Sequence, residues 1–120
     1  MEPSPTYRPG HHVLADLYGC RHLDDVLTIE AILSRAATAA GATIIATHFH
    51  AFPSAGGVTG MVLLAESHIS IHTWPEHGFA AVDIFMCGPA KAEAAMEVIR
   101  DALGSDRLVV KREQRGEGIT

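Results

Sequence analysis

The sequence predicts an α+β fold, a two-layer α/β sandwich in which two helices cover one face of a mostly antiparallel sheet. Six short segments alternate apolar with polar residues or are rich in β-branched and aromatic residues, which is typical of strands. Two longer segments repeat apolar residues at helical spacing. Four of the predicted strands follow one another without a helix between them, which favours antiparallel pairing.

The elements are predicted in the order βαββββαβ. The first strand alternates over residues 11–19, and the first helix spans residues 24–41, with an aspartate as its N-cap and Gly41 as its end. Four strands then follow at residues 42–52, 58–65, 68–74 and 79–87. The second helix runs from Pro89 to Gly104, and residues 107–113 form the last strand.

Length and composition indicate one domain over residues 1–120. Hydrophobic residues make up 48% of the chain and charged residues 19%, which is typical of a globular protein and not of a disordered one. Two helices on one face leave the other face of the sheet uncovered. A homo-oligomer, most simply a dimer, would bury that face.

Charge and chain ends point away from several classes of partner. The formal net charge of −5 argues against nucleic acid or an anionic membrane, since both require a basic surface, and favours a small-molecule substrate. Residues 1–12 lack a basic segment followed by an apolar run, so we expect no signal peptide and a cytoplasmic location. In that reducing compartment Cys20 and Cys87 are expected to be free thiols.

The histidine-rich centre of the chain allows a metal site. His48 and His50 are two residues apart and His68 and His72 are four apart, so on strands each pair points to one face. A zinc site, however, requires three or four protein ligands, and the spacing matches no specific metal-binding template. A non-cleaving metal- or ligand-binding domain is therefore the alternative of a different functional class.

Ser67 offers a covalent chemistry instead. Its hydroxyl can attack the carbonyl of the preceding Glu66 through a five-membered ring, which converts the peptide bond into an ester. β-Elimination and hydrolysis then leave an N-terminal pyruvoyl group. These steps require a sharp turn, a donor for the oxyanion and an acid/base group, for which His68 and His72 are candidates.

The segment "AESHISIHTWPE", followed by "DIFMCG", closely resembles the prokaryotic S-adenosylmethionine decarboxylase proenzyme family. The segments "GHHVLADLYGC" and "GATIIATHFHAF" occur in that family's order and approximate spacing, so the resemblance covers most of residues 10–112. It implies a two-layer sandwich with active sites at a homodimer interface. It also implies self-cleavage between Glu66 and Ser67 into a β chain of residues 1–66 and an α chain of residues 67–120.

The resemblance assigns a role to each candidate residue. Ser67 becomes the covalent pyruvoyl cofactor that forms a Schiff base with the substrate, His72 assists processing, and Cys87 is the catalytic proton donor. Glu76 holds the ribose hydroxyls of the substrate and Phe52 stacks on adenine. Thr59 stands where the family commonly has a serine that supports processing, and His68 is a second candidate for processing support. A cysteine in the apolar segment "DIFMC" is also typical of a buried structural thiol.

The implied reaction is the decarboxylation of S-adenosylmethionine, which supplies aminopropyl groups for spermidine synthesis. The loop "AFPSAGG" is longer and richer in glycine than the family pattern, and it borders the implied substrate pocket. Members of this family also decarboxylate other amino acids. Ornithine or arginine is therefore the alternative substrate with the same pyruvoyl chemistry.

Overall fold

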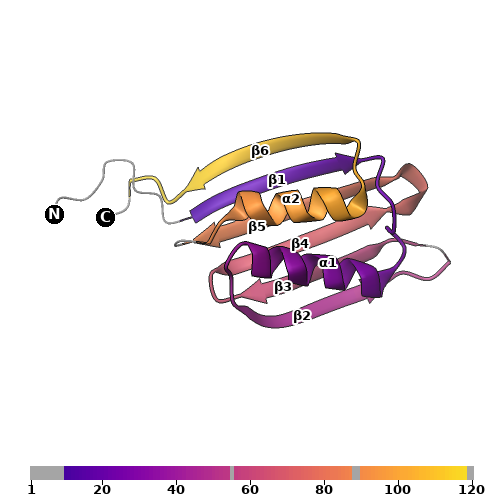
Figure 1. The fold of residues 1–120 in the computed structure, drawn as a ribbon, viewed down its shortest axis with the longest axis horizontal. Coiled ribbons are helices and arrows are strands. Elements are labelled where there is room, and N and C mark those ends of the chain that lie inside the picture. The colour runs from indigo at the N-terminus through magenta and orange to yellow at the C-terminus, as the bar shows by residue number, and fades with distance from the viewer. Residues whose placement is uncertain (1–9, 55, 88–89, 119–120) are drawn as a thin grey trace.

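The computed structural model describes residues 10–54, 56–87 and 90–118, and it contains one sheet with two helices packed on one face (Figure 1). The strands are β1 (Gly10–Tyr18), β2 (Ile44–Ala51), β3 (Val58–Leu64), β4 (Ser67–Trp74), β5 (Phe79–Cys87) and β6 (Arg107–Arg115). The helices are α1 (Val26–Ala39) and α2 (Ala92–Leu103). The predicted fold class and the order βαββββαβ are confirmed.

The strand order in the sheet is β2-β3-β4-β5-β1-β6, and each of these neighbouring pairs is antiparallel. The consecutive strands β2 to β5 form a meander, as the absence of helices between them predicts. The first strand then adds beside β5, and the last strand adds beside β1. β4 consequently lies inside the sheet, with β3 on one side and β5 on the other.

The first helix begins and ends where the sequence predicts. The side chain of Asp25 caps it, because its carboxylate accepts hydrogen bonds from the Thr28 backbone N–H at 3.1 Å and the Thr28 hydroxyl at 2.8 Å. These bonds hold the pKa of Asp25 below its usual range. Gly41 follows the helix with a φ of +77°, a left-handed conformation that glycine adopts without strain.

The second helix confirms one predicted end. Gly104 terminates it with a φ of +67°, but the helix begins at Ala92, and the predicted start at Pro89 lies outside the described residues. In the part of the chain that the structure describes, neither helix has the length and apolarity that a membrane crossing requires.

The two faces of the sheet differ in character, as predicted. The face under the helices is apolar and fully buried, with Val13, Leu17, Val62, Ile69, Ile84 and Met86 among its residues. The other face, here called the open face, carries no helix (Figure 1). It presents histidines, aromatic rings and acidic side chains, among them Tyr18, His68, His72, Trp74, Asp83 and Phe85. Leu63 and Val109 are 41% and 40% exposed there.

The connection from β4 to β5 is tightly held. It is a short 3₁₀ helix, Pro75–His77, which the sequence did not predict, followed by Gly78 with a φ of +60°. Just before it, the buried hydroxyl of Thr73 donates to the Leu23 carbonyl and accepts from the Val58 backbone N–H, both at 2.7 Å. The end of β4 is thereby fixed to the start of β3 and to the segment that leads into α1.

Candidate active site

The predicted site residues fall into two groups at opposite ends of β4. The Ser67 cluster contains Glu66, Ser67, His68 and Cys87, at the start of β4 and the end of β5. The His72 cluster contains Phe52, Thr59, His72 and Glu76, around the end of β4.

The Ser67 cluster is built on a tight turn between β3 and β4. Ala65 and Glu66 form the turn, and the Ala65 N–H donates to the Thr43 carbonyl at 2.9 Å. The Glu66 carboxylate accepts from the Thr43 N–H, also at 2.9 Å. Glu66 is therefore held in place through its side chain. Nothing in the sequence indicated that Thr43 would be the partner that holds it. The turn fixes the Glu66–Ser67 peptide bond at the point where β4 begins.

The carbonyl oxygen of Glu66 accepts two hydrogen bonds from one residue. The Cys87 backbone N–H and the Cys87 thiol each donate to it, both at 3.0 Å. Cys87 is exposed, so the structure excludes the buried structural thiol that its apolar strand also allowed. Two donors aimed at one carbonyl oxygen are the arrangement that stabilises an oxyanion on that atom.

The backbone at Ser67 is strained in a direction that favours ring closure. Its φ is +147°, a region that residues with a Cβ rarely adopt and that costs on the order of 1–3 kcal/mol. Cβ and the carbonyl carbon lie ~120° apart around a tetrahedral Cα, so Cβ is only about 30° from eclipsing the Glu66 carbonyl carbon. A five-membered ring of Oγ, Cβ, Cα, N and that carbon needs such a small torsion. An ordinary strand φ near −120° would place Cβ far from it.

The Ser67 hydroxyl has a partner on the next residue. Its Oγ lies 3.2 Å from His68 Nδ1. Successive side chains of a regular strand point to opposite faces, so the irregular φ at Ser67 is what allows this contact. The ring of His68 lies on the open face, edge-on to the Phe85 ring with centroids 6.1 Å apart.

The His72 cluster is organised by aromatic stacking. The His72 ring lies parallel to the Trp74 indole, with centroids 4.2 Å apart and an interplanar angle of 13°. Thr59 on β3 is the register partner of His72. Phe52 is 45% exposed and packs edge-on against His50, with centroids 4.6 Å apart. Glu76 is exposed on the 3₁₀ helix, and all four predicted residues therefore lie at one end of the sheet.

One chain does not bring the two clusters together. His72 is five residues beyond Ser67 on the same strand, and at about 3.3 Å per residue their Cα atoms are ~16 Å apart. Within a single chain His72 is therefore out of reach of the Glu66–Ser67 bond. The predicted active site at a homodimer interface is compatible with this separation.

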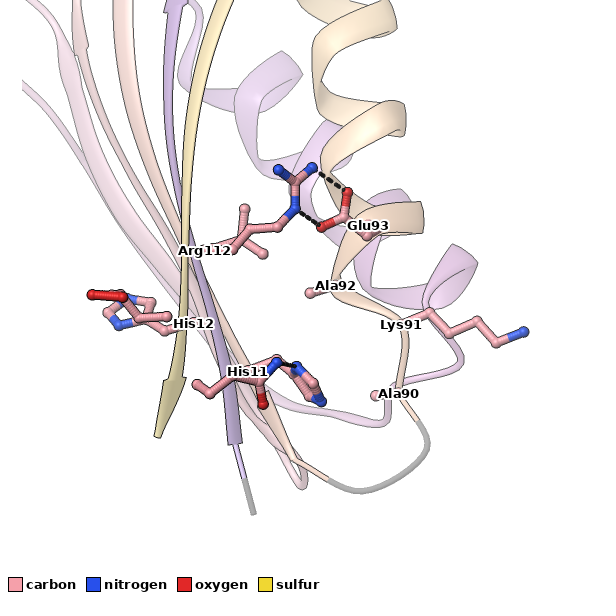
Figure 2. Close-up of a pocket in the computed structure, with 10 residues that line it drawn as sticks. His11, His12, Ala90, Lys91, Ala92, Glu93 and Arg112 are labelled. Carbon is pink, nitrogen blue, oxygen red and sulfur yellow. Dashed lines mark hydrogen bonds and ion pairs between the residues drawn. The ribbon is translucent and has the colours of Figure 1, made fainter. Parts of the chain in front are cut away.

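Two cavities differ in their relation to these clusters. A cavity of 690 Å³ on the open face includes Thr59, His72 and Trp74 together with Ser70 and Asp83. A smaller one of 330 Å³ lies between α2 and the β1–β6 edge, and Figure 2 shows the Glu93–Arg112 pair above it. The smaller cavity is lined by no predicted site residue. The larger one is lined by Thr59 and His72 of the His72 cluster, but not by Phe52 or Glu76.

The described residues contain no ligand set that would support the metal-binding alternative. Within residues 10–54, 56–87 and 90–118, no three histidine, cysteine or acidic side chains are placed to hold an ion. His48 and His50 do share one face, as do His68 and His72, but neither pair gains a third ligand. Cys20 and Cys87 are both free, and burial raises the pKa of the Cys20 thiol.

Comparison with known proteins agrees with the motif. A family model described as S-adenosylmethionine decarboxylase matches residues 11–116. S-adenosylmethionine decarboxylase proenzymes of Aquifex aeolicus and Thermomicrobium roseum are 48% and 40% identical, over 89% of this chain and 81% and 93% of theirs. The crystal structure of the Aquifex aeolicus adenosylmethionine decarboxylase superimposes with a TM-score of 0.85 at 46% identity, covering 92% of this chain and 93% of that one. The chain therefore belongs to the S-adenosylmethionine decarboxylase family.

Proposed function

We propose that this protein is a pyruvoyl-dependent S-adenosylmethionine decarboxylase, made as a proenzyme that cleaves itself between Glu66 and Ser67. The observation that carries the proposal is the geometry of that peptide bond. Ser67 is held with its Cβ nearly eclipsing the Glu66 carbonyl carbon, while Cys87 donates twice to the Glu66 carbonyl oxygen. The family relationship supports the substrate, because its curated members are named for it.

Cleavage begins with an acyl shift. Ser67 Oγ bonds to the Glu66 carbonyl carbon, and the negative charge on the carbonyl oxygen is stabilised by the N–H and S–H of Cys87. The C–N bond then breaks, the Ser67 nitrogen takes a proton, and an ester joins Glu66 to Ser67. Relief of the strained φ at Ser67 favours this step.

Elimination completes cleavage. A base removes the Cα proton of Ser67 and the Glu66 carboxylate leaves as the end of the β chain, residues 1–66. The dehydroalanine that remains tautomerises to an imine, and water hydrolyses it to a pyruvoyl group with loss of ammonia. The α chain, residues 67–120, then carries the cofactor, which supplies an electron sink for decarboxylation of a bound amino acid.

His72 is the proposed base for elimination, and it acts on the partner subunit. Within one chain it is too far from Ser67, and the open face bears exposed apolar and aromatic side chains that a second copy would cover. A two-fold dimer through the open faces would place the Ser67 cluster of each subunit against the His72 cluster of the other. Each interface then contains two equivalent sites.

The remaining predicted residues bind substrate or support the chemistry. Glu76 and Phe52 are both exposed and accessible to a ligand, and we assign them to the ribose hydroxyls and the adenine ring. Cys87 protonates the former α-carbon after carbon dioxide leaves, and Thr59 supports processing beside His72. The product supplies aminopropyl groups for spermidine synthesis. A free thiol in this role fits the reducing cytoplasm.

Intact mass under denaturing conditions tests the cleavage. We expect two polypeptides divided between Glu66 and Ser67, and a single full-length species for Ser67→Ala. Ser70→Ala, on the same strand, is the matched control and should still cleave. A single unbroken chain for the unmodified protein after prolonged incubation would contradict the proposal.

Carbon dioxide release separates the candidate substrates. The processed enzyme should release it from S-adenosylmethionine and not from ornithine or arginine. Borohydride reduction in the presence of the true substrate should add the mass of the decarboxylated amine to the α chain. If the enzyme turns over ornithine or arginine instead, the proposed pyruvoyl chemistry stands and the proposed substrate is wrong.

A further inference from the structure

We propose that His68 is the general base of the ester-forming step, and that this step is completed within a single chain. The inference rests on the proposed self-cleavage at Ser67. Its starting point is the 3.2 Å contact between Ser67 Oγ and His68 Nδ1. No other side chain is recorded in a hydrogen bond with this hydroxyl in the described part of the chain.

The position of His68 is fixed by its neighbours on the open face. Its ring meets the Phe85 ring edge-on at 6.1 Å, and it pairs in register with Leu63 on β3 and Phe85 on β5. Both cross-strand neighbours are apolar, so they do not compete for Nδ1. The imidazole is therefore held beside the hydroxyl by packing, with its ring half-buried.

These groups account for every proton transfer in the acyl shift. With the proton of the neutral imidazole on Nε2, Nδ1 accepts the hydrogen bond from Oγ–H. Nδ1 takes that proton as Oγ bonds to the Glu66 carbonyl carbon, and the charge on the carbonyl oxygen is held by Cys87. The imidazolium then returns the proton to the departing Ser67 nitrogen. One C–O bond forms, one C–N bond breaks, and no outside reactant is required.

All the groups for this step therefore lie in one chain, on β4, on β5 and in the turn that precedes β4. The base for elimination, His72, lies about 16 Å away along β4 and must come from the partner subunit. Processing is thus divided into an ester-forming step within one subunit and an elimination step between subunits. A chain without His72 should accumulate the ester.

Cleavage by hydroxylamine detects the ester directly. This reagent cleaves esters under mild conditions, and the sequence contains no asparagine, so the sensitive Asn–Gly bond is absent. Purified His72→Ala protein treated with hydroxylamine should give two fragments by intact mass. The second should begin with Ser67, and the first should end in a hydroxamate on Glu66.

The decisive variant is His68→Asn combined with His72→Ala. Asparagine retains a hydrogen-bond acceptor but cannot take the proton. Fragment release should fall at least ~100-fold, in line with the usual contribution of a general base. His12→Asn with His72→Ala is the matched control, because His12 contacts the same Phe85 ring at 5.5 Å without bonding to Ser67. It should cleave like His72→Ala alone.

Rescue separates a base from a structural role. Added imidazole should restore ester formation in His68→Ala combined with His72→Ala, and it should not affect Ser67→Ala. Equal cleavage rates with and without His68, or no rescue, would overturn the assignment of the base. No hydroxylamine-sensitive bond in His72→Ala would overturn the single-chain step. Failure of the unmodified protein to process would instead refute the proposed function.

Discussion

The two ends of β4 are built on opposite principles. At the Ser67 end, the backbone is strained, the peptide oxygen carries two donors, and the nearby thiol is exposed. At the Trp74 end, Thr73 is buried with both its hydrogen-bonding functions satisfied, the His72 ring stacks on Trp74, and the Phe79 ring packs against Trp74 at a tilt. The first end combines backbone strain with exposed reactive groups, whereas the second is held by buried hydrogen bonds and ring packing.

The largest effect is expected when two variants, one altered at each end of β4, are coexpressed. Ser67→Ala lacks the proposed cleavage residue and His72→Ala lacks the proposed base, so neither should complete processing alone. Coexpressed at equal levels as a two-fold dimer, they should form mixed dimers in which His72 of one subunit meets Ser67 of the other. About half of the His72→Ala chains should then cleave, as measured by intact mass. No cleavage in the mixture would show that the clusters do not meet across subunits.

Cys87→Ala tests the donors at the Ser67 end. The backbone N–H remains but the S–H is lost, so processing should slow roughly 100-fold, the usual effect of removing one oxyanion donor, and still reach completion. Carbon dioxide release by the cleaved protein should also fall, because the proposed proton donor is gone. Cys20→Ala is the matched control. A normal rate of carbon dioxide release in cleaved Cys87→Ala would refute the proton-donor role, and a normal processing rate would refute the oxyanion role.

Thr73→Val tests the packing at the Trp74 end. The valine has a similar shape but leaves the Val58 N–H and the Leu23 carbonyl without their partner in a buried place. The free energy of unfolding of an uncleavable Ser67→Ala chain should fall by about 2–4 kcal/mol in urea titrations. Thr38→Val, on the exposed side of α1, should change it by less than ~0.5 kcal/mol. Equal losses would mean that the buried hydroxyl has no special role.

The Glu93–Arg112 pair should have the smallest effect, because both side chains are more than half exposed. Hydrogen bonds from Arg112 hold the pKa of Glu93 below its usual range, so the stabilisation is present above that range and is lost as pH falls through the lowered pKa. Glu93→Gln should therefore cost ~0.2–1 kcal/mol at pH 7 and nothing in strong acid. A difference in unfolding free energy that stays constant across pH would argue against the ion pair. Glu93→Gln should leave processing and turnover at the two ends of β4 unchanged.

The fold was predictable because its signals are local. Helical spacing, the Asp25 cap and the glycines that end each helix act within a few residues, so they are visible in the sequence. The start of α2 at Ala92 and the 3₁₀ helix after Trp74 depend on how the chain re-enters the sheet, and no short pattern encodes them.

The site was predictable only in part. The motif named Ser67, His72 and Cys87 and implied a site at a homodimer interface, but it did not indicate which residues each subunit contributes. It did not indicate that the Thr43 N–H anchors Glu66 or that Trp74 stacks on His72. The first contact joins two residues 23 positions apart that lie outside the strands, the second depends on the rotamers of two rings, and both are set by packing.

The sequence by itself determined the alternation, the C-terminal ends of both helices and the residues able to form a pyruvoyl group, because each depends on the chemistry of neighbouring residues. Only the tertiary structure decided that Cys87 meets the Glu66 carbonyl from 21 residues away, since that contact requires β4 and β5 in register. It also decided that Ser67 and His72 lie far apart, because the strand between them is extended. The active site is therefore completed, in our proposal, by a second chain.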